Sequence, residues 1–326
     1  MIQLGFNDAK QHCSVVFLEH CLDPRYPPSC PPSLNVIMKF ASKIMALLAI
    51  DKSVTLYARR QCLTTASAAL LVGSFLILTH DMQVDDVIGR LSTLACASTE
   101  FGGGITLRGC LTAIRLSKSL GLLKSVKDLE VTKMKMRIKS ETMPHTSMQM
   151  DDADSLYQII VPGRLLLASS HRTQQTSSRH TLGCHAAACA RLGVCLVLRV
   201  RERPAAGPDH FAIGFAARGI AVEDLPLGPG CLHMLRALDT LLAILRSAPG
   251  PVAVHADAAG LRAAEPLLAA CLVTACGFAP GSAAAWLRMA HPAAGIAAGR
   301  PGRCSTPGPA EWAGVGGCAA GRLRVS

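Results

Sequence analysis

The residues whose types and spacing could do chemistry lie in one stretch of eight that follows the apolar run Pro251–Val254. A buried strand that ends in small residues and leads into a helix aims several backbone N–H groups at one point, which suits an anion. An arginine in such a turn can bind two phosphate oxygens at once. The sequence therefore predicts an anion site here. Its residues are His255, Ala256, Asp257, Ala258, Ala259, Gly260, Leu261 and Arg262.

The surrounding elements predict an α/β fold with a mostly parallel sheet, because strands alternate with helices. The expected strands are 54–57, a hairpin over 157–167, a central strand 194–200, one strand within 213–227, and 252–254. The expected helices are 34–48, 65–78, 84–91, 106–123, 180–192, 232–247, 265–274 and 282–289. Asp81 precedes the helix 84–91 and is expected to cap it.

The chain of 326 residues is long enough for two ordinary cores. We expect an irregular leader over 1–33, an N-terminal non-catalytic domain over 34–132 and a basic and polar linker over 133–155. A second domain over 156–300 contains the predicted anion site, and a flexible tail occupies 301–326. Two copies of a pattern, offset by 198 residues, pair Val54 with Val252 and Leu70 with Leu268. Both copies predict a strand, a loop of small residues and two helices, which indicates two related domains.

Composition narrows the function classes. A net charge of +11 favours acidic partners in general, but nucleic acid is not the favoured one. The longest apolar stretch, 66–78, is too short to span a membrane, and the N-terminus lacks the features of a signal peptide, so we expect an intracellular protein in cytoplasm, nucleus or cytoskeleton. The 14 cysteines form no Cys-x2-Cys pair. We therefore expect no metal and no cofactor, and interpret His180, Cys184, His185 and Cys189 as helix residues.

In its order of motifs, the chain resembles the mitotic-exit dual-specificity protein phosphatases of the cell-division-cycle type. The resemblance rests on Ser33–Met38 and Ala68–Gly73 in the first domain, and on Tyr157–Arg164 across the junction. In the second domain it rests on Asp224-Leu225, Val252–His255, Arg262 and Trp286–Arg288. The resemblance implies two tandem phosphatase-like domains, each a central sheet flanked by helices, of which the second is the catalytic one.

The resemblance also implies which catalytic positions have changed. The family's nucleophilic cysteine follows the loop histidine, and that position is Ala256, whose methyl group cannot attack phosphorus. The general acid falls on Pro229, and the hydroxyl residue after the loop arginine is Ala263. Asp224 matches a structural aspartate of the family better than the acid. No catalytic residue is therefore expected to be intact.

Phosphate binding is expected to be weakened as well. Asp257 adds a carboxylate beside the anion, and the glycine of the loop has moved to Gly260. Pro266 is unfavourable inside a helix by roughly 3 kcal/mol, unless the helix begins later or its first turn unwinds. Arg262 either keeps a residual anion-binding role or forms an ordinary surface ion pair with Asp257 or Glu265.

Three functions follow from these residues. The leading one is a pseudophosphatase, a scaffold that binds a protein, in one version a phosphoprotein, without turnover. The second is a true phosphatase with an unconventional nucleophile, for which Cys231, two residues after Pro229, is the nearest thiol in sequence order. The third is a structural component of a cytoskeletal assembly, which the basic linker residues would contact. Those residues are Lys133, Lys135, Arg137 and Lys139.

Overall fold

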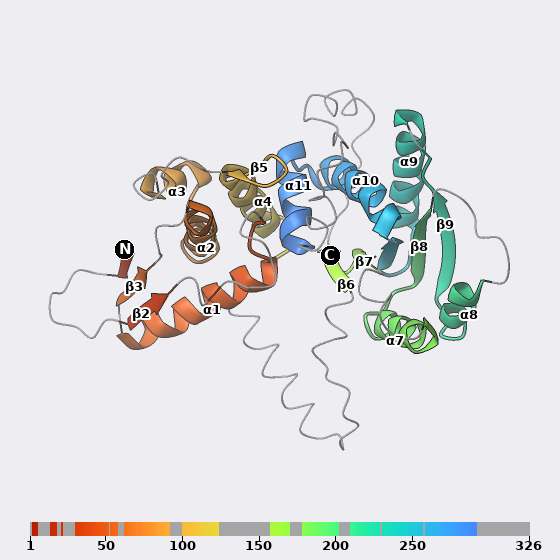
Figure 1. Ribbon diagram of the computed structural model, residues 1–326, viewed down its shortest axis with the longest axis horizontal. Coiled ribbons are helices and arrows are strands. Elements are labelled where there is room, and N and C mark those ends of the chain that lie inside the picture. Colours follow the sequence, from red (N-terminus) through yellow and green to blue (C-terminus); the bar gives the residue numbers. More distant parts are fainter. Residues whose placement is uncertain are drawn as a thin grey trace, which may run out of the picture. The chain divides into compact units, whose positions relative to one another are not determined.

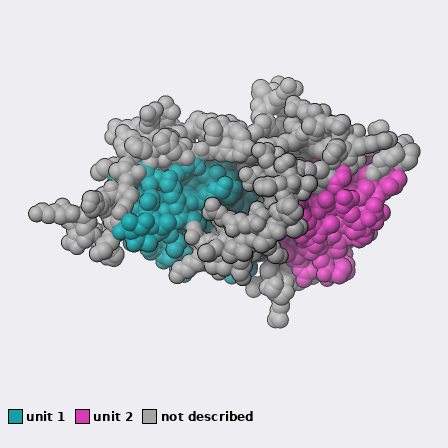
Figure 2. All heavy atoms as spheres, turned by 90° about the horizontal axis from the view of Figure 1, so that it is seen from below, with its two compact units in different colours: residues 1–145, 284–296 teal, residues 146–283, 297–326 magenta. Residues whose placement is uncertain are grey.

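A computed structural model describes twelve stretches of the chain. They are residues 2–5, 14–17, 21, 30–51, 53–57, 62–91, 100–123, 157–169, 178–201, 209–228, 230–256 and 258–291. The chain forms two compact units, coloured separately in Figure 2. Residues 1–145 and 284–296 form the first unit, and residues 146–283 and 297–326 form the second. The segment 284–296 belongs to the first unit, whereas the sequence assigned it to the second domain.

The first unit contains a three-stranded sheet and four helices before residue 124 among its described residues (Figure 1). The elements are β1 Ile2–Gly5, β2 Ser14–Phe17, α1 Leu34–Asp51, β3 Ser53–Tyr57, α2 Cys62–His80, α3 Val84–Leu91, β4 Glu100–Phe101, β5 Ile105–Thr106 and α4 Leu107–Ser119. β3 lies between β1, with which it is antiparallel, and β2, with which it is parallel. Residues 1–33 were expected to be irregular, but β1 and β2 lie within them. Each is only four residues long and pairs with the distant β3, so the local sequence carried little signal.

Helix α2 lies at the centre of the first core. Its residues Ala66–Phe75 are all buried, because the segment carries only two polar side chains, Ser67 and Ser74. The Ser74 hydroxyl donates to the Leu70 carbonyl at 2.5 Å, which satisfies it inside the helix. A Cβ on Gly73 would lie 2.9 Å from Leu111 Cδ2, so the glycine permits α2 and α4 to pack closely.

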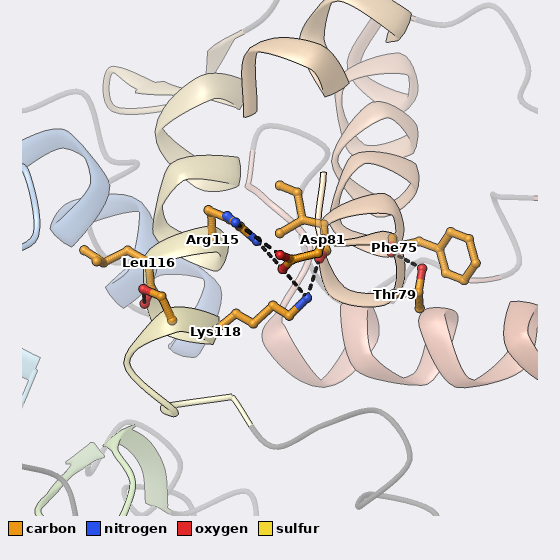
Figure 3. A network of polar contacts seen from close by, with 8 residues as sticks. Phe75, Thr79, Asp81, Arg115, Leu116 and Lys118 are labelled. Carbon is orange, nitrogen blue, oxygen red and sulfur yellow. Dashed lines mark hydrogen bonds and ion pairs between the residues drawn. The ribbon is translucent and has the colours of Figure 1, made fainter. Parts of the chain in front are cut away.

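The corner after α2 is fixed by Asp81 (Figure 3). Its φ of 56° places it in the left-handed region, which an aspartate tolerates better than most residues. The carboxylate accepts hydrogen bonds from Arg115 and from Lys118 Nζ, the latter at 2.8 Å. Lys118 Nζ also donates to the Ile77 carbonyl at 2.9 Å. The expectation that Asp81 caps α3 was wrong, because two cations of α4 bind its carboxylate instead.

The second unit contains a five-stranded mixed sheet with helices on both faces. Its elements are β6 Tyr157–Val161, β7 Leu165–Ser169, α7 Ser178–Arg191, β8 Leu196–Arg201, α8 His210–Ala216, β9 Ala221–Pro226, α9 Cys231–Ser247, β10 Val252–Ala256 and α10 Ala258–Cys276. The strand order is β6-β7-β10-β8-β9, and only the β6–β7 pair is antiparallel. The predicted mostly parallel sheet is therefore confirmed. The strand predicted at 194–200 is β8, which lies inside the sheet between β10 and β9, and β10 is the middle one of the five strands.

The two faces of this sheet carry different helices. Buried residues of α7 and α8 form one core with every second residue of the strands, which include Leu166, Val197 and Ala253. Helices α9 and α10 contact each other, and α10 contacts β8 and β10 (Figure 1). Alternating side chains of β10 therefore face different helix pairs, as the period of two in a strand requires.

The expected repeat stays a prediction, although its two copies show the same order of elements, and residues 284–290 of the second copy lie in the first unit. β3, α2 and α3 follow one another as β10, α10 and α11 Pro280–Ala290 do. The sheets differ, however, since β3 belongs to three strands and β10 to five. In the described part of the chain, no single helix is both long and apolar enough to cross a membrane. The consecutive segments Ala264–Cys276 and Pro280–Ala290 meet that criterion only when taken as a bent pair.

Candidate functional site

The predicted anion stretch begins at the end of the central strand. β10 runs from Val252 to Ala256, and Ala256 is completely buried. His255 is half-buried and faces the side of α7 and α8, because its ring contacts rings from both helices. Ala256, the position that the resemblance assigns to a nucleophile, is thus the last residue of β10, with no reactive group.

Only one residue separates β10 from α10. The helix begins at Ala258, seven residues before the predicted start at Glu265. In an α-helix the first four N–H groups lack intrahelical partners, and these belong to residues 258–261. The N–H of Arg262 is directed to the carbonyl of Ala258, four residues earlier. The stretch therefore presents a helix N-terminus rather than a separate loop that wraps around an anion.

Pro266 lies inside α10, and the helix continues on both sides of it. Proline has no N–H, so the carbonyl of Arg262 loses its usual intrahelical partner. The sequence offered two ways to avoid this cost, a later helix start or an unwound first turn, and the helix shows neither. The free-energy cost of the proline therefore remains within α10.

Several predicted site positions lie outside the described residues. They are Asp257, Pro229 and the side chains of residues 258–263, which include Arg262 and Ala263. Most of the leader, the linker 133–155 and the tail 301–326 also lie outside them. Cys231 is described, and it is the exposed first residue of α9, after Gly230 with a φ of 104°.

A charged row crosses the sheet beside His255. His255 of β10 is in register with Arg199 of β8, and Arg199 is in register with Asp224 of β9. Paired residues on adjacent strands point to the same face, so the three side chains share the face of α7 and α8. Arg199 is buried, with 5% of its surface exposed.

Two carboxylates bind the buried guanidinium. Arg199 Nε donates to Asp224 Oδ1 at 2.7 Å, and Nη2 lies 2.5 Å from Asp209 Oδ2. The hydrogen bond from Arg199 holds the pKa of Asp209 below its usual value. Asp209 Oδ1 also accepts from the N–H of Ala212 at 3.1 Å, which caps α8. Among the described residues, Arg199 Nη1 has no hydrogen-bond partner.

Rings extend this cluster to both helices. The guanidinium carbon of Arg199 lies 5.4 Å from the centroid of the Phe211 ring, within the range of a cation–π contact. The Phe211 ring lies 4.7 Å from His255 and 4.6 Å from Phe215. His185 of α7 contacts His255 edge-on at 6.2 Å. Polar and aromatic contacts therefore connect α7, α8, β8, β9 and β10.

Asp224, which the resemblance matches to a structural aspartate, accepts a hydrogen bond from Arg199 Nε through its carboxylate. The sequence analysis did not identify Arg199 or Asp209. A charged residue inside the apolar strand 196–200 was the available signal, because an arginine in a central strand needs a paired carboxylate. Of the histidines and cysteines that were interpreted as helix residues on α7, His185 and Cys189 are buried. No group of three metal-ligating side chains occurs within the described ranges.

Two solved structures similar to this chain are protein tyrosine phosphatases. The crystal structure of Tk-PTP in its active form shares 19% sequence identity, covers 48% of this chain and 92% of its own, and has a TM-score of 0.33. A chain described as a protein tyrosine phosphatase from Leishmania major shares 25% identity, covers 40% of this chain and 80% of its own, and has a TM-score of 0.29. No protein-family model and no curated protein sequence matches the chain.

Proposed function

We propose that this chain is a pseudophosphatase, a catalytically inactive relative of the dual-specificity phosphatases of the mitotic-exit type. In this proposal it binds a protein partner, in the sharper version a phosphoprotein, and releases no phosphate. The observation that carries the proposal is Ala256. It is buried at the end of the central strand, immediately before a helix N-terminus, where the resembled family places its nucleophile.

The chemistry of the neighbouring residues supports the same proposal. A covalent phosphoenzyme requires a thiolate or another nucleophile, and the methyl group of Ala256 supplies none. The Asp224 carboxylate accepts a hydrogen bond from Arg199 Nε, which supports a structural role for it in this proposal. The helix N-terminus at Ala258 still favours negative charge, so in this proposal anion binding is better preserved than catalysis.

Binding is tested with a fluorescent phosphoserine peptide and the same peptide without phosphate. We expect the full chain to bind the phosphorylated form more tightly, and Arg262→Ala to reduce that difference while Arg262→Lys retains part of it. Equal binding of both peptides would remove the phosphoprotein version and leave a scaffold for an unmodified partner. Phosphate release that Arg262→Ala abolishes would overturn the pseudophosphatase itself.

The alternative with an unconventional nucleophile is tested in the same preparation. Cys231 is exposed, so substrate could reach its thiol. Quenching a reaction with an aryl phosphate and finding phosphocysteine at Cys231 by mass spectrometry would support this alternative. Turnover that persists unchanged in Cys231→Ala would end it.

We also propose that the protein acts inside the cell, in a reducing compartment. The support is chemical, since Cys110 and Cys271 are buried thiols not joined in disulfides. Maleimide labelling of the denatured protein from cells lysed under acid quench tests this, and extensive disulfide formation would contradict it.

A further inference from the structure

A stack of rings connects two helices to the central strand of the second unit. His185 of α7 contacts His255 of β10, His255 contacts Phe211 of α8, and Phe211 packs on Phe215 of the same helix. α7 and α8 also contact each other along this face of the sheet (Figure 1). A change in the charge of one ring would therefore affect the packing of both helices.

His185 is the most deeply buried ionisable ring in this stack. Only 2% of its surface is exposed, and its neighbours on α7, Ala186, Ala188 and Cys189, belong to the hydrophobic core with Phe215 and Ala253. Removal from water disfavours the charged imidazolium, so burial lowers the pKa of His185. Burial therefore favours the uncharged ring in the folded protein.

We propose that His185 is a pH sensor whose protonation releases α7 and α8 from the sheet. His255 and Phe211 connect the sensor to α8, and the neutral ring keeps both helices in place. We call this arrangement the histidine latch, formed by His185, His255 and Phe211. The proposal does not depend on phosphate binding, because it concerns the opposite face of the sheet from α10.

Among the side chains that the structure describes, the charged groups that face the latch come from four elements. Arg199 lies on β8, Asp209 at the start of α8, Asp224 on β9 and His255 on β10. Arg191, in the last turn of α7, is exposed, and β7 contributes no ionisable side chain to this face. Both carboxylates already bind Arg199, which offsets their attraction for a second cation. Burial therefore dominates the protonation of His185.

The direction of the effect follows from linkage. The open state has an exposed histidine with a pKa near 6.5, whereas the closed state takes up its proton only at lower pH, so acid favours opening. The pKa of histidine in the open state alone sets the upper limit of the change in the opening constant. For one histidine, the opening constant rises at most about 25-fold between pH 7 and pH 5.

Hydrogen exchange of the full chain, followed by mass spectrometry at pH 7, 6 and 5, measures this opening. After correction for the intrinsic exchange rate at each pH, we expect protection of α7 and α8 amides to fall by up to 25-fold. Protection of α9, on the other face, should fall much less. His185→Phe keeps a ring without a titrating nitrogen, and His185→Gln keeps a polar group, so either variant should remove the pH dependence.

His233→Gln is the matched control, because His233 is an exposed histidine of the same unit. It should open with acid as the wild type does. Three results would overturn the proposal. They are unchanged protection of α7 in the wild type, an acid-induced loss that persists in a folded His185 variant, and an equal loss in α7 and α9, which would indicate general unfolding.

Discussion

Replacing Arg199 with methionine tests whether the buried guanidinium organises the second unit. Methionine retains much of the apolar stem, so the change removes the charge and the donors more than the packing. Hydrogen bonds between charged partners contribute about 1.5–3 kcal/mol each. Arg199 makes two, to Asp209 and Asp224, but those side chains are 29% and 34% exposed and therefore partly screened by water. We expect a loss of about 2–4 kcal/mol in the free energy of unfolding.

The companion variants distinguish charge from packing. In Arg199→Met the two carboxylates lose their cation, and Asp209→Asn with Asp224→Asn removes their negative charge. Asparagine at position 209 can still accept from the Ala212 N–H and cap α8. The triple variant should therefore regain part of the stability lost in Arg199→Met, since no unpaired charge remains.

Native-state hydrogen exchange of β8 and β9 amides in increasing urea is the suitable assay, because a chain with two compact units need not unfold in one step. Stability of β8 within about 0.5 kcal/mol of the wild type in Arg199→Met would refute the reasoning. A triple variant as unstable as Arg199→Met, or less stable, would show that packing rather than charge carries the effect.

Three further predictions concern single residues. Hydrogen bonds from Arg115 and Lys118 lower the pKa of Asp81 to about 2, so its stabilisation is present above pH 3.8 and disappears as pH falls toward 2. In Asp81→Asn, the stability of the first unit, followed by circular dichroism, should depend less on pH in that window. Asp86→Asn should leave this pH dependence unchanged. Parallel acid-unfolding curves for the wild type and Asp81→Asn would contradict the prediction. Gly73→Ala should destabilise by about 1–3 kcal/mol in urea unfolding, because its methyl group meets side chains at 2.9 and 3.0 Å. Gly89→Ala meets nothing within 4 Å and should stabilise by about 0.5–1 kcal/mol, and equal effects at the two glycines would argue against close packing of α2. Pro266→Ala should restore a hydrogen bond to the Arg262 carbonyl and stabilise α10 by up to about 3 kcal/mol in hydrogen exchange, whereas destabilisation would mean that the proline suits the helix.

The elements that the sequence predicted well are those with a strong local pattern. The run Val252–Val254 is entirely apolar and is bounded by proline, so it predicted a buried strand, and it lies within β10. Helix α2 is apolar for most of its length, which predicted its burial. Local composition was sufficient in both cases because the whole segment is enclosed by the core.

The elements that the sequence missed depend on distant contacts. Helix α8 is seven residues long and is held by Asp209 on Arg199, a contact that no local pattern reveals. β1 and β2 are short and gain their partners only when β3 is in place. Asp81 was expected to act within its own turn, yet residues 34 and 37 positions later bind it.

The start of α10 shows a different limit. Pro266 is unfavourable inside a helix that starts near Gly260, and the predicted helix began at Glu265. The helix begins at Ala258 instead, since alanine has the highest helix propensity and residues 258–264 include four alanines. The helix propensity of the residues in the first two turns outweighed the unfavourable effect of one proline. The chemical interpretation of Ala256 needed no such detail, because the residue type alone excludes a nucleophile.

The measurement that tests the central claim most directly is phosphate release from a small aryl phosphate by the full wild-type chain beside Arg262→Ala. An aryl leaving group needs little help from a general acid, so this substrate reveals any surviving nucleophile. The account predicts that both proteins stay at the rate of the buffer and that no phosphorylated enzyme is found by mass spectrometry. Wild-type release above the buffer rate that disappears in Arg262→Ala would contradict it.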